Sequence, residues 1–174
     1  MKLKLMAAIF ASVLTISGCS NKVEEKPVVK VEKGTIAPAI EIGKKFEPGT
    51  LKDQFGKEGT VDENSEKVIM VFAKSTGHLV KEFLNTKPEN YLEEHHVIFI
   101  ADVSKMPSMI FEYAALPDLQ KHKYPIYLIL DESVSQKFKN DKYKDYVMVI
   151  DLDNGIIKEV EFVTTAKDLE EAID

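Results

Sequence analysis

The chain has 174 residues, of which 44% are hydrophobic and 30% are charged, and its formal net charge at pH 7 is −6. This length suits a single domain with short appended segments. All 23 basic residues are lysine, so the chain lacks the guanidinium fork that phosphate sites commonly use. Because nucleic-acid binding depends on neutralising phosphates, the acidic composition argues against a nucleic-acid partner.

The N-terminus has the pattern of an export signal. Lys2 and Lys4 precede an apolar stretch at residues 5–16, which has the length of a signal-peptide core and no stop-transfer pattern after it. Residues 16–19, ISGC, then place small residues before a cysteine and resemble the lipobox of bacterial lipoproteins. The resemblance implies a cleaved signal peptide at residues 1–18 and a diacylglyceryl group on the Cys19 thiol. The alternatives are an ordinary signal peptide or a buried helix.

Lipid on Cys19 would hold the protein at a membrane. In such lipoproteins, an aspartate directly after the lipidated cysteine indicates retention in the inner membrane. This chain has Ser20 at that position. The resemblance therefore implies the cell envelope, at the periplasmic face of the outer membrane if the cell is Gram-negative. Cys19 is also the only cysteine, so its lipidation leaves no thiol in the folded domain. Thiol–disulfide exchange, which needs an attacking thiolate and a second sulfur, is then excluded.

Residues 19–39 mix lysine, glutamate, valine and proline without a helical or alternating period. This composition predicts a lipidated N-terminus followed by a flexible tether. The folded domain is predicted to span residues 40–174.

Apolar runs and turn residues predict the elements of this domain in the order hairpin, β-α-β-α-β, hairpin and helix. The predicted strands are residues 50–54, 59–62, 68–73, 97–103, 126–130, 146–151 and 156–163. The first helix is predicted to begin near residue 77. Further helices are predicted at residues 86–94, 107–116, 117–122, 133–138 and 166–173, with a break between the second and third of these at Pro117. Right-handed crossovers would make the three middle strands parallel, and the last hairpin, joined by Asp153-Asn154-Gly155, would add an antiparallel edge.

Four segments carry a resemblance to the thioredoxin-like superfamily, with peroxiredoxins and periplasmic thioredoxin-like reductases as the branch they resemble most. They are TLKDQFGKEGTVDE for the opening hairpin, KVIMVFAKSTGHLVKEFL for the strand and active-site helix, YPIYLILDESVSQKF for a later strand and helix, and YVMVIDLDNGIIKEVEF for the last hairpin. The resemblance covers residues 46–173. It implies an α/β fold, a three-layer α/β/α sandwich with a mixed central sheet and an N-terminal β-hairpin extension.

The reactive residues of that superfamily are missing. With Phe72 placed on the family's aromatic residue, the nucleophilic cysteine falls on Gly77 and its partner on Val80, and neither can form a thiolate. The family's cis-proline should precede Tyr146, but no proline stands there; Pro125 precedes an earlier strand, and its isomer is left open. The resemblance therefore transfers no catalytic residue, and we expect no cofactor.

A helix N-terminus at this position would still favour an anion. The candidate binding residues at this vacated active site are Ser75, Thr76, Gly77 and His78. The alternatives are that Ser75 or Thr76 only caps the helix and that His78 is a solvated side chain.

Three other groups of residues are interpreted as structural, and we expect no bound metal. Adjacent histidines in the sequence EEHH at residues 93–96 point to different faces. Met106 and Met109 are expected to pack in the core at a helix start. Residues 151–155 resemble the start of a calcium-binding EF-hand loop, which needs glycine at its sixth position and glutamate at its twelfth. Counted from Asp151, neither position holds the required residue, so this segment is predicted to form a turn.

Two functions from different classes remain. The first is a redox-inactive thioredoxin-like domain, anchored by lipid on Cys19, that binds an envelope protein or a small ligand. The alternative is a histidine-dependent envelope protein that handles a metal or peroxide, with His78 at its centre.

Overall fold

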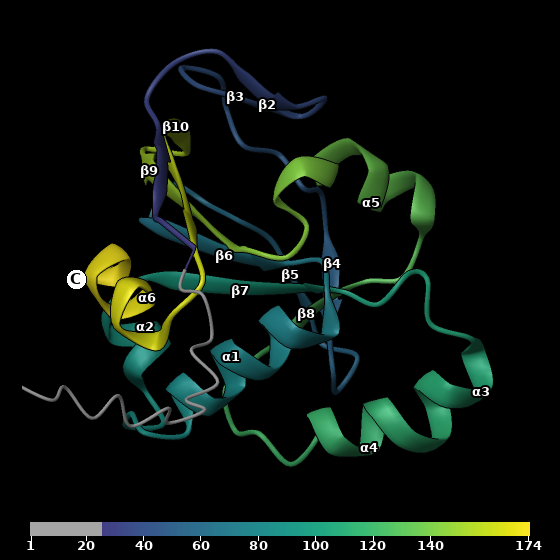
Figure 1. Cartoon of the computed structure of the whole chain (residues 1–174). Helices are drawn as coiled ribbons and strands as arrows, with labels where there is room; N and C mark the ends of the chain where they lie inside the picture. Colours follow the sequence, from purple (N-terminus) through teal and green to yellow (C-terminus); the bar gives the residue numbers. More distant parts are fainter. Residues whose placement is uncertain (1–25) are drawn as a thin grey trace, which may run out of the picture.

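The computed structural model describes residues 26–174 as one mixed sheet with helices on both sides (Figure 1). The predicted signal peptide and Cys19 lie outside the described residues. The eight strands of the sheet are β1 (Val29–Val31), β10 (Ile156–Val163), β9 (Val147–Asp153), β6 (Lys67–Val71), β7 (Val97–Asp102), β8 (Tyr127–Ile129), β4 (Leu51–Asp53) and β5 (Glu58–Gly59), in spatial order. Within residues 26–174, no helix has the length and apolar character needed to cross a bilayer.

The central strand β6 is buried on both faces. Ile69 and Val71 point into one hydrophobic cluster, whereas Val68 and Met70 point into a second cluster across the sheet. This division follows from the two-residue repeat of a strand and explains the continuous apolar run in the sequence.

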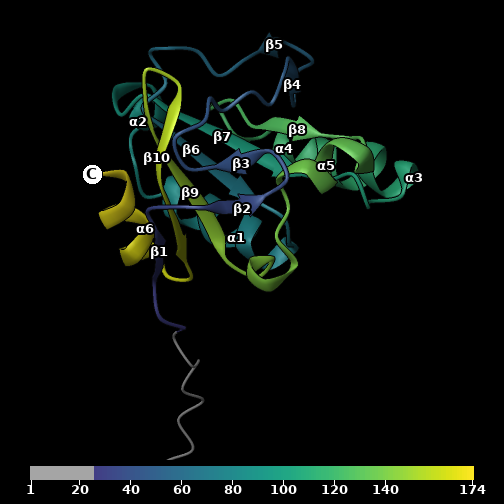
Figure 2. The ribbon, with the colours of Figure 1, turned by 90° about the horizontal axis from the view of Figure 1, so that it is seen from above.

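Helices and a short hairpin cover the two faces of the sheet. The first face carries α1 (Lys74–Leu84), α2 (Tyr91–Glu94), the segment from α3 (Ser108–Ile110) to α4 (Leu116–Leu119), and α6 (Ala166–Ile173). The second face carries α5 (Glu132–Phe138), η2 (Asp141–Tyr143) and the two-stranded hairpin of β2 (Thr35–Ala37) and β3 (Ile40–Glu41). Figure 1 shows β2, β3 and α5 above the sheet and α1 below it, and in Figure 2, which is seen from above, β2 and β3 lie in front of the sheet. The predicted three-layer sandwich is confirmed.

The predicted strand directions are confirmed. Strand β6 is parallel to β7, and β7 is parallel to β8, whereas β9 pairs with β6 in the antiparallel direction. Strands β9 and β10 are joined by Asn154 and Gly155, whose φ angles of 51° and 77° are the left-handed values that a two-residue hairpin turn requires. The first hairpin, β4 with β5, is also present, but its second strand is Glu58–Gly59, whereas the sequence predicted residues 59–62. No described peptide bond is cis, so Pro125 is trans.

The prediction of a flexible tether is wrong for residues 29–37. Val29 to Val31 form β1, which pairs with β10 and becomes the sheet edge that the sequence assigned to the last hairpin. Ile36 and Ala37 are buried, and the Ile36 carbonyl accepts a 2.7 Å hydrogen bond from the Asn140 side chain. The domain therefore begins no later than Val29. The three-residue strand escaped detection because its pairing partner lies far along the chain.

The expected helix break at Pro117 is replaced by a π-helix. Between α3 and α4 lies η1 (Phe111–Ala115), and the Leu116 amide donates to the Phe111 carbonyl, five residues back. Proline has no amide hydrogen and its ring needs space in the preceding turn. One wider turn supplies that space, so the helical segment stays continuous through the proline.

We expect Ile36→Ala to lower the free energy of unfolding by about 2–4 kcal/mol, because it leaves a cavity in the second hydrophobic cluster. Urea unfolding measured by circular dichroism tests this. The matched control is Thr35→Ala at the exposed neighbouring position, which should change stability by less than about 0.5 kcal/mol. Equal, small effects of both substitutions would mean that this segment is a tether after all.

Candidate functional site

The turn between β6 and α1 is closed by Thr76. The hydroxyl of Thr76 donates to the Ala73 carbonyl at 2.8 Å and accepts from the Ala73 amide at 3.3 Å. Thr76 is only 4% exposed, so this hydroxyl is fully engaged inside the turn. Thr76 thus caps the helix from its third position, with Ala73 as the N-cap residue, in line with the capping alternative that the sequence left open.

Helix α1 begins at Lys74, about three residues before the predicted start. The Gly77 amide therefore donates to the Ala73 carbonyl at 3.0 Å as an ordinary helical hydrogen bond. It is not available to an anion, and this part of the predicted anion site is wrong. A Cβ atom at Gly77 would meet only Val71 Cγ2 at 4.0 Å, so close packing does not require glycine there.

Ser75 and His78 are both exposed, but they lie in different surroundings. Ser75 lines a surface groove between α1 and α6, whereas His78 is not among the residues that line it. Of the four predicted binding residues, the structure thus places one in a depression where a ligand could bind.

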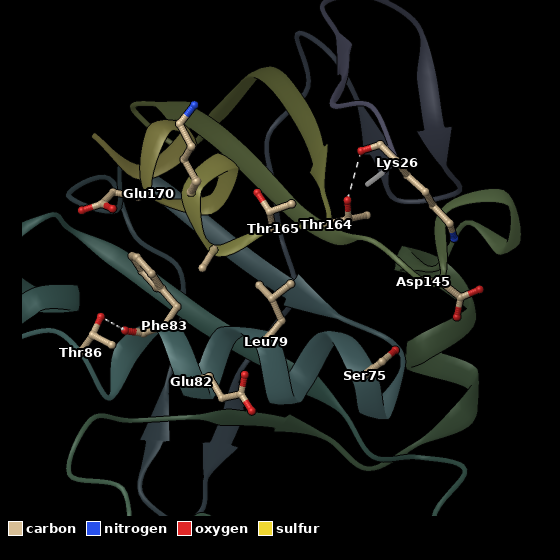
Figure 3. A pocket seen from close by; sticks show the side chains of 12 residues that line it. Lys26, Ser75, Leu79, Glu82, Phe83, Thr86, Asp145, Thr164, Thr165 and Glu170 are labelled. Carbon is tan, nitrogen blue, oxygen red and sulfur yellow. Dashed lines mark hydrogen bonds between the residues drawn. The ribbon is translucent and has the colours of Figure 1, made fainter. Parts of the chain in front are cut away.

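The α1/α6 groove has a volume of about 830 Å³ and draws its walls from four parts of the chain (Figure 3). They are helix α1 with Thr86 two residues beyond its end, the segment 164–170 that leads into α6, the loop before β9, and the first described residue. The lining residues are Lys26, Ser75, Leu79, Glu82, Phe83, Thr86, Asp145, Thr164, Thr165, Ala166, Lys167 and Glu170. Ser75 is the one lining residue that was predicted as a binding residue from the sequence.

The floor of the α1/α6 groove is apolar and its rim is polar. Leu79, Phe83 and Ala166 supply carbon atoms to the lining, and Leu79 packs against the first hydrophobic cluster. The three threonine hydroxyls of the rim make internal hydrogen bonds. Thr86 donates to the Phe83 carbonyl, Thr164 to the Lys26 carbonyl, and Thr165 to Asp168.

Two carboxylates of the rim remain for a ligand. Glu170 pairs with Lys87, and Lys167 pairs with Glu171 at 3.3 Å. Glu82 and Asp145, in contrast, have no ion-pair partner within residues 26–174, and both are exposed. The groove lining also contains two ammonium groups, at Lys26 and Lys167, against three carboxylates, at Glu82, Asp145 and Glu170. The groove therefore combines an apolar floor with a small net negative charge, a combination suited to an apolar side chain flanked by basic groups.

The histidines do not gather at one place. His95 stacks on Tyr91 with ring centroids 4.1 Å apart, and its Nδ1 lies 2.8 Å from the Tyr91 carbonyl. The His122 Nδ1 lies 3.2 Å from the Tyr124 hydroxyl, and burial followed by the nearby Lys81 charge lowers the pKa of His122. The described residues contain no group of three or more side chains arranged to hold a metal ion.

The prediction that Met109 packs in the core is wrong. It is 73% exposed, and Ile110 on α3 and Tyr113 on η1 are also exposed. The apolar pattern at this helix start therefore faces solvent, whereas Phe111 and Leu119 on the same segment pack against the first hydrophobic cluster.

An ion pair fixes α1 against α4. The Lys81 ammonium, only 17% exposed, donates to Asp118 Oδ2 at 2.5 Å, and Lys121 lies 3.3 Å from Asp118 Oδ1. The hydrogen bond from Lys81, helped by Lys121, lowers the pKa of Asp118 to about 2. This contact holds the helix that forms one wall of the α1/α6 groove.

We expect Thr76→Val to lower the free energy of unfolding by about 1 kcal/mol, because it removes the cap of α1 while keeping the side-chain shape. Ser75→Ala is the matched control and should be nearly neutral, since the Ser75 hydroxyl has no hydrogen-bond partner within residues 26–174. Denaturant unfolding of both variants gives the comparison. A larger loss for Ser75→Ala would show that the cap is assigned to the wrong residue.

We expect Asp118→Asn to cost about 1 kcal/mol at pH 7, a value reduced for solvent screening because the Asp118 side chain is half exposed. The folded-state pKa is below the ordinary value of 3.8, so the stabilisation is complete above about pH 4 and is lost as the pH falls toward 2. Unfolding curves measured at pH 7 and pH 2 test whether the cost of Asp118→Asn becomes smaller at the lower pH. Lys81→Met should remove the same pH-dependent part, and a cost of Asp118→Asn that is equal at both pH values would contradict the ion pair.

No protein-family profile matches this chain, and no curated protein sequence is significantly similar to it. Among solved structures, 47 chains are similar. A candidate protein disulfide isomerase from Bacteroides thetaiotaomicron superposes with a TM-score of 0.51 at 17% identity, over 80% of this chain and 89% of that one. StoA from Bacillus subtilis superposes with a TM-score of 0.49 at 17% identity, over 79% of this chain and 100% of that one. The thioredoxin domain of a thiol-disulfide oxidoreductase from Bacteroides vulgatus superposes with a TM-score of 0.46 at 16% identity, over 83% of this chain and 99% of that one.

At these identities the similarity concerns the fold alone. The order of strands, the directions of β6 to β9 and the helices on both faces agree with it. This chain has a thioredoxin-like fold.

Proposed function

We propose that this protein is a lipid-anchored protein of the bacterial cell envelope whose thioredoxin-like domain binds a partner protein or a small ligand without thiol chemistry. The binding site is the α1/α6 groove. The observation that carries the proposal is the composition of this groove, which has an apolar floor, two carboxylates without ion-pair partners, and neither cysteine nor histidine among its lining residues.

The sequence supports the absence of redox chemistry. Its only cysteine is Cys19, which the proposal assigns to the lipid. The two positions that resemble the reactive cysteines hold Gly77 and Val80, and Val80 is fully buried in the first hydrophobic cluster. Without an attacking thiolate, disulfide exchange and thiol-dependent peroxide reduction have no nucleophile.

The groove supports binding because its shape is set by rigid elements. Helix α1 is capped by Thr76 and tied to α4 by Lys81, and α6 is capped by Thr165, whose side chain accepts from the Asp168 amide at 3.0 Å. Sites built on helices hold their side chains more firmly than sites built on loops. Leu79 and Phe83, four residues apart on α1, therefore present a preformed apolar surface to a ligand.

The test is photocrosslinking in intact cells of the source bacterium, with a photoreactive amino acid in place of Glu82 at the groove rim. We expect a discrete adduct from this position and none from Gln136, which is exposed on α5 across the sheet. Ala166→Gln, which extends a side chain into the groove, should lower the adduct yield about tenfold, equivalent to about 1.4 kcal/mol of binding free energy.

The matched control is Ala114→Gln, an exposed alanine of η1 outside the groove, which should leave the yield unchanged. Equal yields from Glu82 and Gln136, or no effect of Ala166→Gln, would contradict a binding site in the α1/α6 groove. Stoichiometric metal in the purified protein, with activity lost in His78→Ala, would instead support the histidine-dependent function.

A further inference from the structure

The chain enters the domain at the rim of the α1/α6 groove. Lys26, the first described residue, is itself a lining residue, and its carbonyl accepts a 3.1 Å hydrogen bond from the Thr164 hydroxyl (Figure 3). The Lys26 ammonium lies 5.2 Å from the centroid of the Tyr146 ring. Three residues later β1 joins the sheet beside β10, so this entry point is fixed by the fold.

The distance from this entry point to the proposed lipid is short. Only residues 20–25 separate Cys19 from Lys26. Seven residue steps reach at most about 25 Å when fully extended, and an average coil of that length spans about 15 Å. A domain of this size is about 40 Å across. The segment is therefore shorter than the domain, and the groove rim stays nearer the lipid than the opposite face does.

The charge of the domain argues against the bilayer itself as the ligand. Removal of Lys2 and Lys4 with the signal peptide leaves 21 basic and 29 acidic residues, a net charge of −8. The groove lining holds three carboxylates, at Glu82, Asp145 and Glu170, and two ammonium groups, at Lys26 and Lys167, so it is also net negative. An anionic lipid surface repels such a face, whereas a basic polypeptide segment is attracted to it.

We infer that the α1/α6 groove takes its ligand from the membrane, and that this ligand is a segment of an integral membrane protein emerging within about 25 Å of the bilayer. The segment carries an apolar side chain for the floor formed by Leu79, Phe83 and Ala166, flanked by basic residues for Glu82 and Asp145. This inference rests on the proposed function, because it assumes both the lipid on Cys19 and binding in the groove.

The experiment uses the same photoreactive residue at position 82 in three forms of the full chain in cells. The first has the native segment, the second has 20 Gly/Ser residues inserted between Glu25 and Lys26, and the third carries Cys19→Ala behind a cleavable signal peptide so that it is released. The insertion should lower the adduct yield about eightfold, because effective concentration falls as about the −3/2 power of tether length. Release should lower the yield at least as much. The same 20 residues added after Asp174 are the control and should have no effect.

The outcomes separate the two proposals. An equal yield from the released form would overturn this inference, since the ligand would then diffuse freely, while groove binding would stand. Adducts with phospholipid, in place of a protein, would also overturn it. No adduct from position 82 in any form would contradict the proposed function and this inference together.

A second measurement tests the orientation alone. The purified lipidated protein is inserted into phosphatidylethanolamine–phosphatidylglycerol vesicles that carry a headgroup quencher. A fluorophore is attached at Glu82→Cys or at Gln136→Cys, which is selective because residues 20–174 contain no other cysteine. We expect stronger quenching at position 82. Equal quenching, or stronger quenching at position 136, would overturn the inference.

Discussion

The pairing of β1 with β10 is the contact on which the functional geometry depends. Only three residue pairs join the two strands, from Val29 opposite Phe162 to Val31 opposite Val160. Lys30 reaches Glu161 at 2.8 Å and Glu159 at 3.3 Å, but such exposed ion pairs contribute little to stability. The strand is held mainly by its backbone hydrogen bonds and by Val29 and Val31, which pack on the second hydrophobic cluster. This pairing decides where the domain begins and brings Lys26 to the α1/α6 groove.

Most of the central fold could be predicted from the sequence, because its signals are local. The apolar runs at β6 and β9 predict buried strands, and the Asn154-Gly155 turn predicts the hairpin that joins β9 to β10. β1 could not be predicted in this way, since three residues with one alternation occur often by chance. The π-helix also escaped, although Pro117 inside an apolar helical pattern signals some disturbance of the hydrogen bonding.

The start of α1 was predictable in principle. Thr76 stands three residues after Ala73, the spacing at which a side chain reaches back to the first amide of a helix. With a helix start predicted near Gly77, the Gly77 amide was expected to be open to an anion. The groove itself could not be inferred, since its walls come from residues separated by more than 140 positions, from Lys26 to Glu170. Only the spacing of Leu79 and Phe83 on one side of α1 gave a partial signal for its floor.

The geometry also bears on how tightly the groove must bind. It is open at the surface, and two of its charged groups are already paired within the domain, so its intrinsic affinity for a short segment is expected to be modest. Under the proposed lipidation of Cys19, only six residues separate the domain from the membrane. A ligand carried by the same membrane would then be present at an effective concentration of about the millimolar range. Contacts too weak to hold a freely diffusing ligand then suffice. In this arrangement β1 contributes to binding without touching the ligand, because it keeps the linking segment short and fixes the face of the domain that the segment leaves.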